Sequence, residues 1–121
     1  LIAEDNALNA EIIMTILEDY GILAELAGDG AVAVDMLKKK PADYYDMILM
    51  DIQMPHMDGY EATEKIRALE DKRADIPIVA MTANAFEEDR RAAFAAGMNG
   101  HVAKPIQVTQ LLKTMSELLV R

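Results

Sequence analysis

The stretch that decides the fold runs from residue 47 to residue 59 and reads Met47-Ile48-Leu49-Met50-Asp51-Ile52-Gln53-Met54-Pro55-His56-Met57-Asp58-Gly59. Four apolar residues in a row are typical of a strand covered on both faces, as in a parallel sheet between helices. Pro55 and the Asp58-Gly59 pair predict that a loop follows. Asp51 is therefore expected where a buried strand ends. At the end of a buried strand an acid either takes part in the chemistry of a ligand crevice or caps the helix that follows.

Outward from this stretch, apolar strand patterns and amphipathic helix patterns alternate along the chain. Strands are predicted at residues 1–3, 22–27, 47–51, 76–81 and 100–103. Helices are predicted from Asn6 or Asn9 to about 20, around 33–37 with an end at 38–40, and at about 59–70, 84–96 and 107–120. The helix at 84–96 is rich in alanine, so we expect it to be the most weakly anchored. Five such alternations predict an α/β fold with a parallel sheet.

Length and composition favour one domain. The chain has 121 residues, 52% of them apolar, which suits a single domain that buries roughly two-thirds of its unfolded surface. We expect one domain over residues 1–121, and because Leu1 lies within a predicted strand, we expect that strand to be trimmed at its N-terminus.

Charge and cysteine content exclude several kinds of function. Twelve basic against 21 acidic residues give a net charge of −9, which repels phosphate backbones, so no direct nucleic-acid binding is expected. The absence of cysteine excludes disulfides, thiolate catalysis and cysteine-based zinc sites. No apolar run reaches the ~18 residues of a membrane helix and no signal-peptide pattern is present. We therefore expect a cytoplasmic domain that makes no membrane contact.

At the ends of four of the five predicted strands lie polar side chains that suit the binding of a phosphate or of its counter-ion. They are Glu4 and Asp5, Asp51, Thr82 and Lys104. In a doubly wound sheet of order 2-1-3-4-5, the first and third strands are neighbours, which brings the three carboxylates into one crevice. At ~4 Å each like-charged pair costs on the order of 1 to 4 kcal/mol, so the cluster favours a divalent cation or a raised pKa. Mg²⁺ is the expected cation, because it prefers carboxylate, water and phosphate oxygens.

These residue types suit phosphoryl transfer, which needs positioning and charge neutralisation. Asp51 is the expected nucleophile, and Glu4 and Asp5 are expected to hold the metal. Lys104 is expected to pair with Asp51 before reaction and with a phosphate oxygen afterwards, while Thr82 donates to another phosphate oxygen. Taken singly, each side chain is more often a cap or a solvent-facing group. Their joint occurrence at four strand ends favours a phosphoryl-transfer site over these separate roles.

At these residues the chain resembles the receiver domain of two-component response regulators. The resemblance rests on Glu4-Asp5-Asn6, on Met50-Asp51-Ile52-Gln53-Met54-Pro55 with Met57-Asp58-Gly59, on Thr82-Ala83 and on Lys104-Pro105. It implies a flavodoxin-like fold with five helices, a phosphohistidine donor on a histidine kinase or histidine phosphotransfer domain, and Mg²⁺. It also implies a metal contact from the Gln53 carbonyl and a cis Lys104-Pro105 peptide. The longer sequence segments around these motifs are most similar to those of receivers of hybrid sensor histidine kinases.

Two positions depart from the family pattern. Glu4 stands where an aspartate is commoner, which implies a metal contact through water, so magnesium affinity is expected to depend more on Asp5. His101 stands where an aromatic switch residue is common, so His101 is either a packed residue or a smaller switch that responds with Thr82. Such a switch would change the face formed by the fourth helix, fifth strand and fifth helix.

Three rival functions were weighed. A dehalogenase-like phosphohydrolase also uses an aspartate nucleophile, but it needs an early nucleophile with an acid two residues later, whereas Asp51 is late and Gln53 follows it. A flavodoxin-like cofactor binder needs a phosphate loop after the first strand, and none is present. An inactive receiver-like docking module is expected to have lost an acid or the lysine, and the chain keeps them.

Overall fold

The computed structural model describes residues 1–83 and 87–119 of the chain. Its strands are β1 (Ile2–Ala3), β2 (Leu26–Ala27), β3 (Ile48–Asp51), β4 (Ile78–Thr82) and β5 (Gly100–Ala103). Its helices are α1 (Ala7–Asp19), α2 (Gly30–Lys39), α3 (Gly59–Arg67), α4 (Glu87–Ala96) and α5 (Val108–Leu119), and a 3-10 turn, η1 (Lys72–Asp75), precedes β4.

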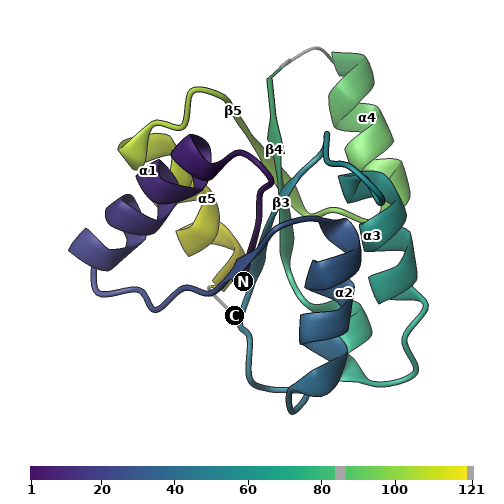
Figure 1. The fold of residues 1–121 in the computed structure, drawn as a ribbon. Coiled ribbons are helices and arrows are strands. Elements are labelled where there is room, and N and C mark those ends of the chain that lie inside the picture. The colour runs from purple at the N-terminus through teal and green to yellow at the C-terminus, as the bar shows by residue number, and fades with distance from the viewer. Residues whose placement is uncertain (84–86, 120–121) are drawn as a thin grey trace.

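The five strands form one parallel sheet in the order β2-β1-β3-β4-β5, which confirms the predicted topology. β1 and β3 are neighbours, with Ala3 opposite Met50, and Asp51 lies opposite Met81 of β4. In Figure 1 the strands run through the middle of the molecule, with α1 and α5 to the left of the sheet and α2, α3 and α4 to the right. All strands run the same way, so their carboxyl ends share one edge, at the top of this view.

The core consists of two apolar layers, one on each face of the sheet, and alternate strand residues supply them. Ile48 and Met50 face the layer packed against α2, α3 and α4, whereas Leu49 faces the layer packed against α1 and α5. Both faces of the central strands are therefore covered, which is why residues 47–50 contain no polar position. Every residue of β3 and β4 is buried.

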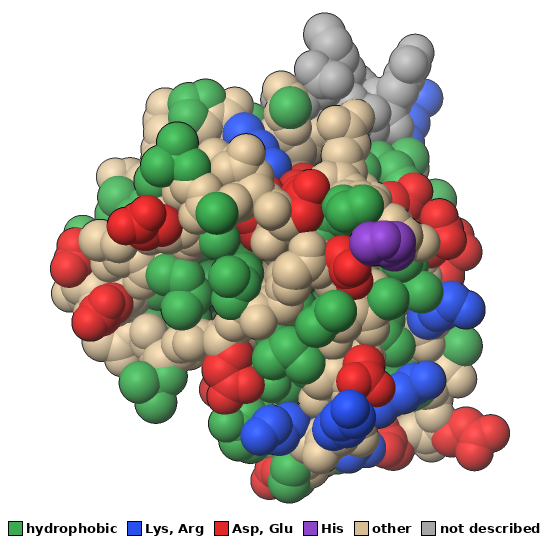
Figure 2. Space-filling view, in the orientation of Figure 1, with side chains coloured by type: hydrophobic (Ala, Val, Ile, Leu, Met, Phe, Trp, Pro, Cys, Tyr) green, Lys and Arg blue, Asp and Glu red, His purple; other side chains and the backbone are tan. Residues whose placement is uncertain are grey.

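Side-chain caps begin three of the helices. Asn6 accepts a hydrogen bond from the Asn9 amide (3.0 Å), Asp29 one from the Val32 amide, and Asp58 one from the Glu61 amide (both 2.9 Å). Of the two predicted caps for α1, Asn6 is thus the one observed. α2 ends in Lys38 and Lys39, which suit the negative end of a helix. Figure 2 shows Lys and Arg side chains gathered around this lower end of the molecule.

The structure departs from the predicted boundaries in three places. Strand β2 begins only at Leu26, because residues 22–25 lie at the sheet edge, where Leu23 is 98% exposed. Helix α3 ends at Arg67 instead of near residue 70, and the turn η1 was not predicted. The predicted helix start at Asn84, as well as Phe86 and Val120, lie outside the described residues.

Helix α4 buries little of its described surface. Ala93 is buried, whereas Phe94 is 51% exposed. This agrees with the prediction that this helix is weakly anchored. Within the described part of the chain, no helix is long and apolar enough to cross a membrane.

Candidate functional site

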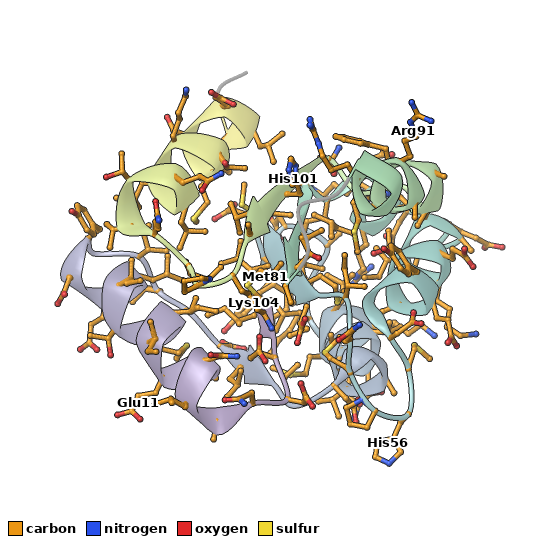
Figure 3. The ribbon with its side chains drawn as sticks, turned by 90° about the horizontal axis from the view of Figure 1, so that it is seen from above. Glu11, His56, Met81, Arg91, His101 and Lys104 are labelled. Atoms are coloured by element: carbon orange, nitrogen blue, oxygen red, sulfur yellow. The ribbon has the colours of Figure 1, made fainter. Side chains whose placement is uncertain are left out.

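The residues predicted from the sequence meet at the carboxyl edge of the sheet. Asp51 and Thr82 are the last residues of β3 and β4, Glu4 and Asp5 follow β1, and Lys104 follows β5. Figure 3, seen from above, looks onto this edge and places Lys104 near its centre. The residues that line the crevice here are Glu4, Asp5, Asn6, Asn9, Asp51, Ile52, Gln53, Thr82, Ala83 and Lys104.

Lys104 lies between two buried carboxylates. Its Nζ is 3.1 Å from Oδ2 of Asp51 and 3.2 Å from Oε2 of Glu4. Burial works against the ammonium group, but the hydrogen bond and charge of Asp51, together with the charge of Glu4, outweigh it and raise the pKa of Lys104. Lys104 is therefore the cation that compensates both acids, and the predicted pairing of Lys104 with Asp51 is observed.

The two acids that follow β1 are in different environments. Glu4 is 2% exposed, and its Oε1 accepts a hydrogen bond from the Asn6 amide at 3.1 Å. Its Oε2 is buried and lies 3.2 Å from Nζ of Lys104, and it has no other partner among the described residues. Asp5, by contrast, is exposed. The second oxygen of Glu4 thus depends on Lys104 alone.

Asp51 is held in an environment that opposes its charge. Burial is the largest cause and the charge of Glu4 the second, while Lys104 opposes both, and the net effect raises the pKa of Asp51 to about 6. Asp51 is 4% exposed. Above that pH Asp51 is a carboxylate that lacks full stabilisation, which is the state a cation or an electrophile would relieve.

The acidic cluster has the composition of a site for a hard divalent cation. One carboxylate oxygen from each of Glu4, Asp5 and Asp51 lies within 4.8 Å of the others. One ammonium, that of Lys104, is shared by Glu4 and Asp51, and the raised pKa of Asp51 indicates that the local negative charge is incompletely compensated. Oxygen ligands without sulfur or imidazole suit Mg²⁺. The residues present therefore fit the cation expected from the sequence.

Gly59 holds the backbone of Asp51 in place, a role that was not inferred from the sequence. The Gly59 amide donates to the Ile52 carbonyl at 2.8 Å, and the Ile52 amide donates to the Met81 carbonyl at 3.2 Å. A Cβ atom on Gly59 would lie less than 3.0 Å from the Asp51 carbonyl oxygen. The first turn of α3 thus packs directly on the peptide after Asp51. The Asp58-Gly59 pair was interpreted only as a turn, although a glycine there also permits such close approach.

The other predicted residues differ in how closely they approach the site. Thr82 is 7% exposed and lines the crevice. Gln53 also lines the crevice, and its backbone amide donates to Oδ1 of Asp51 at 3.3 Å. The Lys104-Pro105 peptide is cis, as predicted. His101 is half-buried on β5 opposite Ala80 and does not line the crevice, and Figure 3 places it away from Lys104. Burial, and next the charge of Arg90, lower the pKa of His101.

Comparison with known proteins shows the family. The model for the response regulator receiver domain matches residues 1–116. The chain belongs to this family. The predicted receiver family and its α/β fold are therefore confirmed. The dehalogenase-like phosphohydrolase and the flavodoxin-like binder are not favoured.

The most similar curated relatives include receivers within long kinases. Hybrid signal transduction histidine kinase B of Dictyostelium discoideum is 40% identical over 125 residues, covering 95% of the chain and 6% of that protein. Sensor histidine kinase GacS of Pseudomonas protegens is 38% identical over 117 residues, covering 95% of the chain and 12% of that protein. The receiver domain therefore spans only a small part of the length of these relatives.

Solved receivers share the fold. The receiver domain of sensor histidine kinase PA1611 from Pseudomonas aeruginosa is 39% identical with a TM-score of 0.86, covers 98% of this chain and 93% of its own, and was solved with magnesium in its active-site cleft. The receiver of Saccharomyces cerevisiae Ssk1, solved with the histidine phosphotransfer protein Ypd1, is 32% identical with a TM-score of 0.88, over 97% of this chain and 85% of its own.

Proposed function

We propose that this domain takes a phosphoryl group from a phosphohistidine onto Asp51. The observation that carries the proposal is the position of Lys104, which is ion-paired with both Asp51 and Glu4 inside one acidic crevice. That arrangement keeps a carboxylate buried, charged and open to an electrophile. The family membership and the similar receivers in histidine kinases support the same role.

In the proposed transfer, an Asp51 carboxylate oxygen attacks the phosphorus atom and the bond from phosphorus to the donor imidazole nitrogen breaks. The product is an acyl phosphate on Asp51 and a donor histidine that keeps the bond's electron pair. Lys104 moves from the Asp51 carboxylate to a phosphate oxygen, and the Thr82 hydroxyl donates to another. The pKa of about 6 means that Asp51 is mainly ionised at neutral pH and able to attack.

Mg²⁺ is proposed as the cofactor, held by Asp5, Asp51 and the Gln53 carbonyl, with Glu4 acting through water. When bound, it neutralises charge on the phosphate oxygens. The different burial of the two acids supports this division, because Asp5 is exposed to an incoming ion whereas Glu4 is already held by Asn6 and Lys104. Magnesium titration should show a larger loss of affinity in Asp5→Asn than in Glu4→Gln. Equal losses would contradict the division.

Phosphorylation itself is tested by incubation with magnesium and a small phosphodonor, followed by intact mass. We expect one phosphoryl group on the wild type and none on Asp51→Asn. Asp58→Asn is the matched control, since asparagine also caps a helix and Asp58 caps α3 on the same loop. Asp58→Asn should be phosphorylated like the wild type. Modification retained in Asp51→Asn would show that the phosphoacceptor lies elsewhere.

A surface switch is proposed to follow phosphorylation. Thr82 ends β4, and His101 lies on the neighbouring strand β5 beside the weakly anchored α4. If phosphate draws the Thr82 hydroxyl inward, His101 would turn inward and the face formed by α4, β5 and α5 would change. Amide NMR shifts with a beryllofluoride-type mimic should then concentrate at residues 82–96 and 100–104 and shrink in Thr82→Ala. Changes confined to the acidic crevice would contradict the switch.

Further aspects of the function are proposed from the relatives. The partner is proposed to be a histidine kinase or a histidine phosphotransfer domain, by analogy with the receiver solved with such a protein. The domain is proposed to work in the cytoplasm as one unit of a hybrid sensor histidine kinase. Self-phosphorylation and self-dephosphorylation would be its own chemistry, and the same incubation followed over time measures both.

A further inference from the structure

The loop between β3 and α3, residues 52–58, forms one wall of the acidic crevice. Its first residues are held to the site, since the Gln53 amide lies 3.3 Å from Oδ1 of Asp51 and the Ile52 carbonyl accepts from Gly59 at 2.8 Å. Gln53 itself lines the crevice. The position of this wall therefore depends on what holds the far side of the loop.

The far side of the loop rests on the first turn of α2. The Gly30 amide donates to the Met57 carbonyl at 3.2 Å. A Cβ atom on Gly30 would lie less than 3.0 Å from that carbonyl oxygen and 3.1 Å from the Asp58 carbonyl oxygen. The backbones of loop and helix are thus in direct contact, and a displacement of one is transmitted to the other.

One side-chain pair joins the same two segments. His56 Nδ1 lies 3.1 Å from Oδ2 of Asp29, the N-cap of α2, whose Oδ1 accepts from the Val32 amide at 2.9 Å. His56 has φ +65°, and among the described residues it is the only non-glycine with positive φ. Such a conformation is disfavoured for a residue with a side chain and persists where surrounding contacts hold it. Asp29 therefore caps α2 with one oxygen and holds the strained loop residue with the other.

We propose that Asp29 and His56 are a positioning pair, which anchors the β3–α3 loop on α2 and thereby sets the geometry of the metal crevice. The inference rests on the proposed function, because it assigns the loop a part in metal binding. His56 does not touch the site itself, since Figure 3 shows its side chain directed outward and away from Lys104. Its effect is transmitted along the two residues between it and Gln53, Met54 and Pro55.

The electrostatic setting favours this pairing. The Asp29 side chain is 15% exposed and that of His56 is 77% exposed. The Val32 amide is the main cause that lowers the pKa of Asp29, and His56 adds to it, so Asp29 is a carboxylate at neutral pH. An exposed imidazole gains little from such a contact alone. We therefore expect a moderate effect on metal affinity and a small one on overall stability.

The test is a double-substitution cycle read by magnesium titration. Asp29→Ser keeps a capping oxygen for α2 but does not reach His56, and His56→Gly accepts the positive φ without a side chain. Each single substitution should weaken magnesium binding two- to fivefold, and the double variant should be no weaker than the weaker single variant. Asp35→Ser is the matched control, because Asp35 is an exposed acid of α2 that pairs with Lys39 and not with the loop. It should bind magnesium like the wild type.

Two outcomes would overturn the proposal: wild-type magnesium affinity in both single variants, or effects that multiply in the double variant. A merely structural role would lower the melting temperature without changing magnesium affinity. A positioning role changes the affinity and leaves the phosphorylation rate at saturating magnesium close to that of the wild type. Failure of the proposed function is recognised separately, as a wild type that binds magnesium and is never phosphorylated on Asp51.

Discussion

The two ends of the sheet differ in how fully their buried charged groups are paired. At the carboxyl end, one ammonium, that of Lys104, compensates two buried carboxylates, and Oε2 of Glu4 has no other partner among the described residues. At the amino end, the half-buried guanidinium of Arg67 donates to the carbonyls of Gly97 (2.9 Å), Ala74 (2.6 Å) and Ile76 (2.8 Å) and to the side chain of Asn99 (2.8 Å).

The difference separates the scaffold from the site. Four of the five N–H donors of the Arg67 guanidinium are paired, and Asn99 extends the cluster by pairing with Ile78 in both directions, at 2.8 and 2.9 Å. A well-paired polar network of this kind contributes rigidity. At the carboxyl end the negative charge of the buried carboxylates is not fully compensated, and this leaves the site able to bind a cation and to react. Removing the charged group should therefore change stability in opposite directions at the two ends.

The largest effect is expected for Arg67→Ala. The substitution leaves three carbonyls without their donor, at about 1 to 3 kcal/mol for each group that stays buried and unpaired. Partial access of water reduces the sum, so we expect a loss of about 3 kcal/mol in the free energy of unfolding, measured by urea titration. Lys65→Ala, an exposed site on the same helix, is the control and should change stability little. A loss no larger than that of the control would show that the cluster is not a stabilising network.

A smaller loss is expected for Gly59→Ala. The added Cβ would meet the Asp51 carbonyl, and overpacking of this kind costs about 1 to 3 kcal/mol. Because the backbone of Asp51 must shift, phosphorylation should slow as well. Gly28→Ala is the matched control, since nothing lies within 4 Å of a Cβ at that position. Urea titration and intact mass should distinguish the two variants, and equal behaviour would contradict the close packing of α3 on Asp51.

The smallest effect, and the one of opposite sign, is expected for Asp51→Asn without magnesium. The folded-state pKa of Asp51, about 6, lies above its ordinary value of 3.8, so its ionisation opposes folding. This penalty is absent below about pH 4, where Asp51 is protonated in both states, and it grows as pH rises to about 6. At pH 7 the variant should be about 1 to 2 kcal/mol more stable, because the pKa of about 6 already includes the pairing with Lys104 and solvent screening reduces the full value of the shift.

The pH dependence provides the check on this last effect. Unfolding measured in chelator at pH 4 and at pH 7 should show the stabilisation only at pH 7, and excess magnesium should reduce it, because a bound cation favours the wild-type carboxylate. A variant that is less stable than the wild type at pH 7 without metal would mean that Lys104 compensates Asp51 fully.

The sequence predicted the parallel sheet and the strand-end residues because both depend on local patterns, whereas the strand order came from the doubly wound fold that such an alternation suggests. A buried parallel strand such as β3 is an uninterrupted apolar run, and a polar residue after it marks the shared edge. The contacts of Arg67 and of Gly59 were not predictable in this way, because they join segments that are distant in the sequence. Arg67 has no distinguishing pattern in the sequence, since only the folded chain brings Gly97 and Asn99 to it. The contact of Gly59 with Asp51 likewise depends on the packing angle of α3.

The covering of both sheet faces restricts how other proteins reach Asp51. Helices occupy the two faces, so in the part of the chain that the structure describes Asp51, the proposed phosphoacceptor, is reached from the rim where the strands end. Any macromolecule that delivers a phosphoryl group, and any that removes it, must approach along the direction of the strands and stand over the same small opening. Delivery and removal by separate proteins are then mutually exclusive events, and the order in which partners arrive is governed by their competition for one entrance.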